Sequence, residues 1–325
     1  MTYPLRFDPI YQYRLWGGRR LENWLNVPLP GDGPVGEAWL LSDRDEYPSR
    51  VSDGPLKGRT IAQLMEQSSR EILGRLAPRF RRFPLLLKFL DVQQMLSVQV
   101  HPPDGRSELI PFGDTGKTEA WVILEAGPES RVYAGLKSGV TAAGLRAISR
   151  RTADDYLASF TPVPGQSVLI EAGTVHSIGG GLVVFEVQEN SDVTFRLYDW
   201  DHIDATTGVT RPLQVEQALA CVDFAQGAIQ PVSPKVETDP PIAREQLIEC
   251  SHFRMDRVHS ALPFDVGEAG VPRVLVCLDG GGAIEFNGRE FMMEKGTVML
   301  LPAALGVCRF QPGSPVTMLE LAVPE

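Results

Sequence analysis

A short segment of alternating polar and apolar residues, 96–104, carries side chains that could bind a metal ion. In a β-strand its apolar residues would face one side, and Ser97, Gln99 and His101 would face the other. Three polar side chains on one face of a strand are unusual unless that face lines a cavity. The spacing therefore predicts that Gln99 and His101 are metal ligands on the inner wall of a barrel.

Two later segments supply further donor atoms. Lys117 and Glu119 lie two residues apart just before the apolar strand 120–124, and His176 follows Gly173 at the start of another predicted strand. The candidate metal ligands are Gln99, His101, Glu119 and His176. Any one of these residues alone would more commonly be a surface or hydrogen-bonded side chain. Together they form a mixed nitrogen and oxygen set that suits zinc or a similar divalent ion.

Two cations also stand out. Lys88 lies in an apolar strand-like run, where a lysine is seldom buried without a partner, and Arg196 alternates with apolar neighbours. With Lys117 they would form a positive pocket that suits a small phosphorylated ligand. The alternatives are that Lys88 reaches solvent from an edge strand and that Arg196 pairs on the surface with Asp192 or Asp199.

Composition limits the class of protein. The 325 residues are enough for two domains, and 31 glycines and 26 prolines indicate the many turns of a β-rich fold. A formal net charge of −10 argues against nucleic acid as a partner. We expect no membrane association, because no apolar run could span a bilayer and the first residues lack a signal-peptide core. Four cysteines without paired spacing predict reduced thiols in a cytoplasmic protein.

The hydrophobic pattern divides the chain into two units. The first forty or so residues are predicted to be an irregular lead-in with a strand at 36–42, and a proline-rich passage from about residue 230 a linker. Helices are predicted at 60–76, 141–160 and 213–222. Strands are predicted in the first unit at 84–90, 95–101, 120–124, 167–171, 182–188 and 193–199, and in the second at 273–278, 283–286, 297–301 and 316–321.

The two units share an internal repeat. In each, a glycine-led turn begins a strand that ends in a corner of small residues, and the two copies superpose from Gly165 and Gly296. In that superposition His176 falls on Val307, and His252 and His259 lie too early to replace it. The fold predicted is mainly β, with two tandem cupin-like β-barrels of the jelly-roll type and a few short helices. Residues 1–230 would form the catalytic domain with the metal site, and 240–325 a degenerate barrel without metal.

Several segments resemble the short bacterial form of type I mannose-6-phosphate isomerases. The resemblance is carried by residues 16–18, 36–39, 84–91, 96–102, 116–121, 173–176 and 190–199, and it is weaker in the last third of the chain. It implies that zinc is held by Gln99, His101, Glu119 and His176. It also implies that Arg196 is the active-site arginine, that Ser97, Lys88 and Arg196 contact the substrate phosphate, and that Lys117 and Asp192 lie near the reacting carbons. Residues 113–119 and Ser177 depart from the pattern of the long family members.

The reaction implied by this resemblance is the interconversion of mannose 6-phosphate and fructose 6-phosphate through an enediol. A divalent metal would polarise the substrate oxygens, and a base would move the proton. The sequence leaves Lys117, Glu119 and Asp192 open as the base. Three alternatives are an isomerase of another sugar or sugar phosphate, a non-catalytic sugar-binding cupin, and an Fe(II) oxygenase that uses His101, Glu119 and His176. The partner expected is a small sugar phosphate, and the oligomeric state is not predicted.

Overall fold

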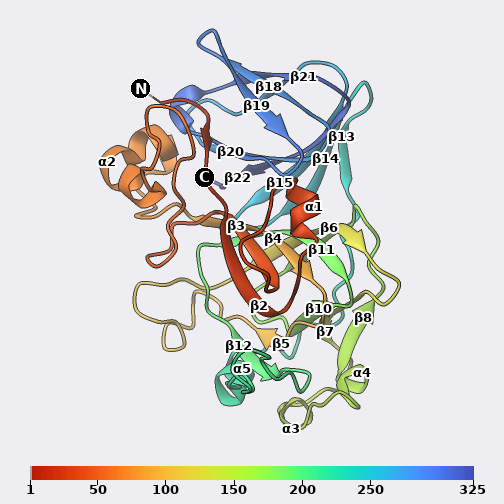
Figure 1. The fold of residues 1–325 in the computed structure, drawn as a ribbon. Helices are drawn as coiled ribbons and strands as arrows, with labels where there is room; N and C mark the ends of the chain where they lie inside the picture. The colour runs from red at the N-terminus through yellow and green to blue at the C-terminus, as the bar shows by residue number, and fades with distance from the viewer. Residues whose placement is uncertain (1) are drawn as a thin grey trace.

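The computed structural model describes residues 2–325, and its strands form four sheets that pair into two stacked β-barrels (Figure 1). The chain is mainly β with few short helices, so the predicted cupin-like fold class is confirmed. The C-terminal strands, drawn in blue, form the barrel at one end of the molecule. Among residues 2–325, the structure has no helix with the length and apolar character needed to cross a membrane.

The first barrel is made by a six-stranded and a five-stranded sheet. The larger has the order β2-β3-β4-β11-β6-β9, and the smaller has the order β12-β5-β10-β7-β8. The strands of the larger sheet are β2 (Ile10–Gly18), β3 (Val35–Leu41), β4 (Leu85–Val92), β11 (Leu182–Glu189), β6 (Glu119–Ala126) and β9 (Ser167–Ile170). Those of the smaller sheet are β12 (Phe195–Tyr198), β5 (Val98–Val100), β10 (His176–Gly179), β7 (Arg131–Leu136) and β8 (Leu157–Phe160).

The second barrel combines a seven-stranded and a four-stranded sheet, ordered β1-β20-β17-β22-β15-β14-β13 and β16-β21-β18-β19. The seven strands are β1 (Leu5–Arg6), β20 (Val298–Leu301), β17 (Arg273–Asp279), β22 (Val316–Ala322), β15 (Arg254–Ser260), β14 (Ile242–Glu249) and β13 (Lys235–Thr238). The four are β16 (Phe264–Val266), β21 (Cys308–Pro312), β18 (Gly281–Phe286) and β19 (Arg289–Glu294).

Helices lie only at the margins of the barrels. The helices are α1 (Leu21–Leu25), α2 (Ile61–Leu73), η1 (Gly74–Leu76), α3 (Ala142–Arg146), α4 (Ala153–Tyr156), α5 (Val215–Cys221) and η2 (Ala303–Leu305). The predicted helices at 60–76 and 213–222 are confirmed by α2 with η1 and by α5. Helix α2 begins where Thr60 and Gln63 form a reciprocal capping box, which satisfies two backbone donors.

The apolar core between the barrels determines which side chains face the interior of the first barrel. Phe89 and Phe185 of the six-stranded sheet pack in one cluster with Leu247, Met255 and Leu319 of the second barrel. Because side chains alternate along a strand, burying that outer face turns the intervening residues of β4 and β11 inward. The interior of the first barrel therefore receives Lys88 of β4 and Glu186 and Gln188 of β11.

Three predictions about elements were wrong. The lead-in is not irregular, because β2 joins the first barrel and β1 pairs with β20 of the second. The helical region 141–160 ends in strand β8, and β13 lies inside the proline-rich passage that was predicted to be a linker. Both of these strands are only four residues long, which is too short for a clear period-two pattern. The division into domains at 230–240 stays a prediction.

The internal repeat is present in the structure. Strands β9 and β20 each begin two residues after the matched glycine, at Ser167 and Val298. Gly165 and Gly296 have φ values of +88° and +85°, a region that favours glycine over other residues. His176 begins β10, and its counterpart Val307 lies just before β21 with 57% of its surface exposed.

Candidate metal centre and its cavity

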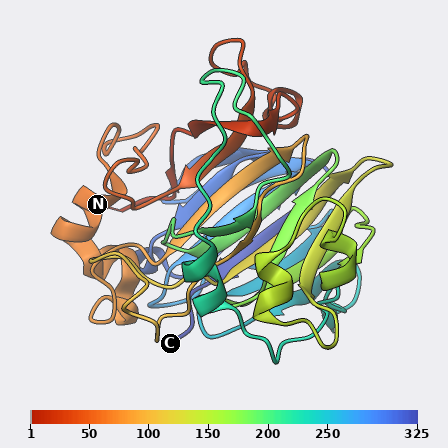
Figure 2. The same ribbon diagram turned by 90° about the horizontal axis from the view of Figure 1, so that it is seen from below.

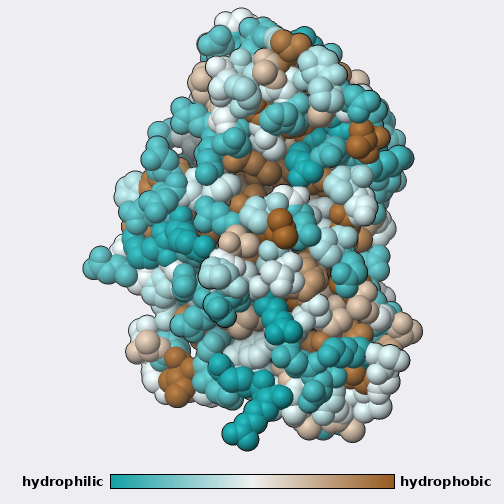
Figure 3. All heavy atoms as spheres, turned by 90° about the vertical axis from the view of Figure 1, so that its right-hand side faces the viewer, coloured by the Kyte–Doolittle hydropathy of each residue, from teal (hydrophilic) through white to brown (hydrophobic). Residues whose placement is uncertain are grey.

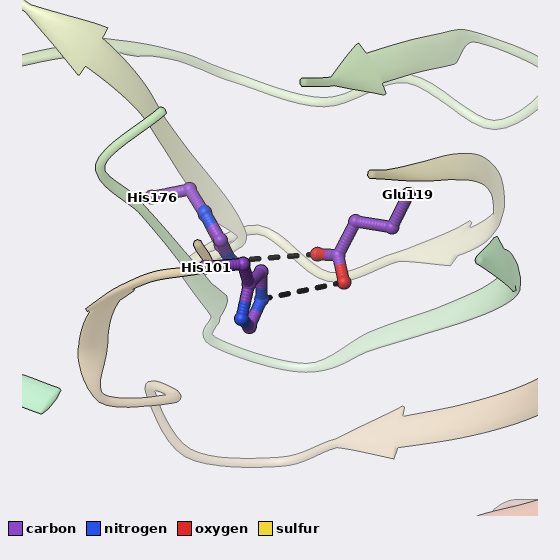
Figure 4. Close-up of side chains that lie close together, drawn as sticks. All are labelled: His101, Glu119 and His176. Carbon is purple, nitrogen blue, oxygen red and sulfur yellow. Dashed lines mark ion pairs between the residues drawn. The ribbon is translucent and has the colours of Figure 1, made fainter. Parts of the chain in front are cut away.

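Three predicted ligands come together inside the first barrel. His101 follows the last residue of β5, Glu119 begins β6 and His176 begins β10. Strands β5 and β10 are neighbours, and their register pairs Gln99 with His176. The Glu119 carboxylate faces both imidazoles in Figure 4. Its oxygens lie 3.4 Å from the Nε2 atom of His101 and 3.4 Å from that of His176, and all three side chains are buried.

Backbone carbonyls fix both imidazoles in the form that binds a metal. Nδ1 of His101 lies 2.8 Å from the carbonyl oxygen of Val193, and Nδ1 of His176 lies 2.9 Å from that of Thr174. A carbonyl oxygen can only accept a hydrogen bond, so each Nδ1 carries the proton. In the neutral imidazoles Nε2 then has a free lone pair, and both Nε2 atoms face Glu119. This outer arrangement is typical of metal-binding histidines.

The electrostatics of the centre favour neutral histidines and an ionised carboxylate. Burial, followed by the charge of Lys117, lowers the pKa of His101 to about 3. Burial likewise lowers the pKa of His176. Burial alone would raise the pKa of Glu119, but Lys117 and the two imidazoles hold that pKa well below its usual range. These are the protonation states that a divalent metal requires.

Gln99 and Ser97 lie beside the three clustered residues. The Nε2 atom of Gln99 lies 3.2 Å from Nε2 of His176, and its Oε1 accepts a hydrogen bond of 3.0 Å from the Ser97 hydroxyl. The two ends of an amide have the same shape, so a half-turn about the last bond would direct Oε1 at a metal. Ser97 is 1% exposed and uses its hydroxyl on Gln99. Its predicted contact with the substrate stays a prediction.

A cavity of about 350 Å³ opens next to this cluster. Gln99 and Lys117 connect the cavity to the metal cluster, and Lys117 lies 2.9 Å from Glu119 Oε2 and 3.2 Å from His101 Nε2. Its charged lining consists of five cations, Arg14, Lys88, Lys117, Arg196 and Arg211, and four carboxylates, Glu37, Glu186, Asp192 and Asp204. Cations are therefore in slight excess in the cavity, although the whole chain is acidic.

Lys88 has a different partner from the one expected. It lies on β4, between β3 and β11, and is 3% exposed, so it is not an edge-strand lysine that reaches solvent. Its Nζ lies 3.0 Å from Glu186 Oε1 and donates a 2.5 Å hydrogen bond to Gln188. Burial opposes its charge, but Glu186 and Glu37 keep its pKa above the usual value. Lys88 is thus already neutralised, and its contact with a phosphate stays a prediction.

Arg196 lines the cavity without a carboxylate partner. It lies on β12, and its Nε atom is buried with no hydrogen-bond partner among residues 2–325. Asp199, one of the predicted surface partners, instead pairs with Arg211 at 2.8 Å. Burial, followed by the charge of Arg211, lowers the pKa of Arg196. A half-buried guanidinium in this position would be stabilised by an anion in the cavity.

Five charged residues of the cavity wall were not predicted from the sequence: Arg14, Glu37, Glu186, Asp204 and Arg211. Glu186 carried the same signal as Lys88, because it is a charged residue in an otherwise apolar strand. Burial raises its pKa despite the nearby Lys88. Arg14 and Glu37 pair at 3.0 Å from strands β2 and β3, and the first of these strands was not predicted.

A loop after β12 covers part of the cavity. Asp204 and Arg211 of this segment line the cavity, and Tyr13 of β2 donates a hydrogen bond of 3.3 Å to Asp204. Seen from below, the segment that follows β12 runs beside the N-terminal strands at the upper edge of the molecule (Figure 2). Residues far apart in the sequence thus form one rim of the cavity.

The fold and the site define a cupin with a candidate divalent-metal centre of two histidines and one carboxylate. Residues 5–138 match the family model described as phosphomannose isomerase type I, catalytic domain. The chain is 31% identical to mannose-6-phosphate isomerase ManA of Bacillus subtilis (strain 168), over 94% of this chain and 95% of that protein. The chain belongs to the type I phosphomannose isomerase family, and its relatives are enzymes.

Solved structures agree with this assignment. The crystal structure of the mannose 6-phosphate isomerase from Bacillus subtilis has a TM-score of 0.90 at 25% identity and covers 99% of this chain and 100% of that chain. A zinc-bound mannose 6-phosphate isomerase has a TM-score of 0.80 at 16% identity, with complete coverage of both chains. At that lower identity the likeness shows the fold alone.

Proposed function

We propose that this protein is a zinc-dependent mannose-6-phosphate isomerase that interconverts mannose 6-phosphate and fructose 6-phosphate. The observation that carries the proposal is the buried cluster of His101, Glu119 and His176 beside a cation-lined cavity. Its relatives are named for this activity. The four cysteines are free thiols, which supports a reducing, cytoplasmic location.

The metal would be one zinc ion per chain, held by Gln99, His101, Glu119 and His176. The support is the donor set of imidazole nitrogens and amide and carboxylate oxygens, which suits zinc, and the zinc-bound neighbour structure. When bound, zinc supplies Lewis acidity that stabilises negative charge on the substrate oxygens.

The substrate phosphate would be held at the mouth of the cavity by Arg196. Its guanidinium lacks an anionic partner, and it lies close enough to Arg211 and Arg14 for their charges to lower its pKa. A dianionic phosphate would relieve this repulsion and accept the paired N–H groups of a guanidinium. Binding energy from the phosphate would then help to orient the reacting carbons at the other end of the cavity.

Proton transfer between the two carbons needs a group that reaches the cavity. Glu119 is placed between two imidazoles, so we do not assign it as the base. Asp192 is exposed at the rim. Lys117 and Glu186 line the interior, and burial raises the pKa of Glu186, which makes its carboxylate a stronger base for proton transfer. We propose Glu186 as the proton-transfer group and Lys117 as the cation that stabilises the developing enediolate.

A panel assay with metal analysis tests this function. The purified protein is loaded with zinc, manganese or Fe(II), and each form is assayed with mannose 6-phosphate and several other aldose phosphates. We expect the highest turnover with zinc and mannose 6-phosphate. A preference for another sugar phosphate would favour an isomerase of different specificity. Oxygen consumption by the Fe(II) form without isomerisation would favour the oxygenase, which could use the same three ligands.

A further inference from the structure

A second cluster of potential metal ligands lies outside the catalytic cavity, at the junction of the two barrels. Asp104 follows the metal-binding strand β5, Glu189 ends β11, and His252 lies in the turn between β14 and β15 of the second barrel. One ligand atom from each of these residues lies within 4.8 Å of the others. The Nδ1 atom of His252 lies 3.2 Å from Glu189 Oε2.

Backbone donors hold each carboxylate with one oxygen turned towards the cluster. Oδ1 of Asp104 accepts a hydrogen bond of 2.7 Å from the amide of Gly116, and Oε1 of Glu189 accepts one of 2.8 Å from the amide of Thr118. The other oxygen of each group makes no such bond. In each carboxylate, a backbone amide anchors one oxygen and the other oxygen is directed at the cluster. Outer contacts of this kind orient carboxylates that bind metals.

The surroundings of His252 are electronegative. The hydrogen bond to Glu189 contributes most to raising the pKa of His252, and the charges of Asp104 and Glu171 add to it. A single imidazolium compensates only part of the charge of the nearby carboxylates, whereas a divalent cation would compensate two unit charges.

We propose that Asp104, Glu189 and His252 form a second divalent-metal site, which takes a borderline transition-metal ion such as Zn²⁺, Ni²⁺ or Mn²⁺. One imidazole and two carboxylates suit these ions, and water would complete the coordination. The site lies outside the cavity of the second barrel and uses none of the ligands of the catalytic cluster.

An ion at this site would stabilise the loop that carries catalytic residues. The amides of Gly116 and Thr118, which anchor the two carboxylates, flank Lys117 and directly precede Glu119. The ion would therefore tie this loop to the second barrel through His252. Because it binds only the folded protein, it raises the melting temperature, and the rise grows with the logarithm of the free ion concentration once this exceeds the dissociation constant.

Equilibrium dialysis of the zinc-loaded protein against excess Zn²⁺, in parallel with Mn²⁺, tests the proposal. We expect two bound ions per chain in the wild type and one in His252→Ala. We also expect added Zn²⁺ to raise the melting temperature of the wild type and not that of His252→Ala. His259→Ala is the matched control, because His259 is an exposed histidine of the same barrel whose side chain hydrogen-bonds to Thr317.

The two metal sites can be separated with one further variant. His176→Ala should lose the catalytic ion and keep the second, so His252→Ala and His176→Ala each retain one ion and the double variant retains none. Glu189→Gln keeps the shape of the side chain and should weaken binding at the second site at least about tenfold. Equal ion content in the wild type and His252→Ala, or an equal loss in His259→Ala, would overturn the second site whatever the result for His176→Ala.

Discussion

At the scale of single residues, the candidate metal centre depends on hydrogen bonds that the ligands make with the backbone. The carbonyls of Val193 and Thr174 hold the protons of His101 and His176 on Nδ1, and this leaves each Nε2 free. Glu119 can then face both imidazoles without a competing proton. Burial keeps the His101 imidazole neutral, and the positive charge of the nearby Lys117 adds to this effect.

The first prediction concerns His176. We expect His176→Ala to lose the ion of the catalytic centre and all measurable turnover, because a zinc site rarely survives the loss of one of its strong ligands. Gln99→Ala should lose less, since a neutral amide is the weakest ligand of the four. Metal content by mass spectrometry and a coupled isomerase assay check both variants. Full metal retention in His176→Ala would refute the ligand assignment.

The second prediction separates two roles of Arg196. If the guanidinium grips phosphate, as proposed, Arg196→Ala should raise KM by roughly 10²-fold while metal content is unchanged, and Arg196→Lys should recover part of the loss. If it stabilises the enediolate, kcat should fall by roughly 10²–10³-fold instead. Steady-state kinetics of both variants distinguish these results. Wild-type values of kcat and KM in Arg196→Ala would contradict both roles.

At the scale of elements, the corner between β3 and β4 depends on a buried carboxyl group. Asp43 follows β3, is 1% exposed and accepts a hydrogen bond of 2.7 Å from the amide of Phe83, just before β4. Its other oxygen has no partner among residues 2–325. Burial raises its pKa to about 6, although the Phe83 amide opposes the shift. The folded protein therefore keeps the proton on Asp43 up to a higher pH than the unfolded chain does.

The third prediction follows from the sign of this shift. In the unfolded chain Asp43 ionises near pH ~4, and in the folded protein only near pH 6, so its ionisation lowers the free energy of unfolding across that interval. Asp43→Asn keeps an acceptor for Phe83 and should stabilise the protein by about 2 kcal/mol at pH 7, with no gain below pH ~4. Urea unfolding at several pH values measures this. A gain that is independent of pH would contradict it.

Helix α2 could be predicted from its long periodic pattern, whereas two of the short strands, β8 and β13, could not. Helix α2 shows its apolar face over several turns, whereas β8 and β13 have only four residues each. The candidate ligands Gln99 and His101 could be selected by residue type and alternation, because they share one face of a predicted strand. The pair Lys88–Glu186 could not, because it depends on β4 lying beside β11, and those strands are distant in the sequence.

At the scale of the whole molecule, the repeat allows the two barrels to be compared position by position. Ile170 and Leu301 lie five residues after the matched glycines, and they pair with Glu119 and Arg273, respectively. A guanidinium thus stands in the second barrel where the first has its metal-facing carboxylate. With Val307 in the place of His176, this favours the prediction that the second cavity binds no metal.

The second barrel contains a network of ion pairs in that region. Glu320 of β22 lies 2.8 Å from Arg244 and accepts a hydrogen bond of 2.8 Å from the amide of Gly267. Arg244 also approaches Asp256 at 3.6 Å. These residues surround a cavity of about 330 Å³.

The surface seen in Figure 3 is mostly polar with only scattered apolar side chains, so on that face the apolar residues are largely confined to the interior.

Glu186 and Glu320 occupy matching positions in this comparison. In the strand register, Glu186 of β11 lies opposite Trp121 of β6 and Lys88 of β4. Glu320 of β22 lies opposite Leu275 of β17 and Asp256 of β15. Each lies on the inner face of its barrel, yet their surroundings differ. Burial disfavours the charge of Glu186, whereas Glu320 neutralises arginines and completes the bonding of a backbone amide.

The last prediction uses these two glutamates as a matched pair. Glu186→Gln should lower kcat by roughly 10²-fold or more, as expected for a proton-transfer group, and should also lower the melting temperature, because the buried Lys88 loses its carboxylate partner. Glu320→Gln should leave kcat and KM unchanged and destabilise the protein by about 2–4 kcal/mol, because Arg244 loses its closest carboxylate. Thermal unfolding and steady-state kinetics of both variants provide the comparison. A loss of turnover in Glu320→Gln at full folding would mean that the second barrel takes part in the reaction. A loss of stability without loss of turnover in Glu186→Gln would mean that Glu186 only neutralises Lys88.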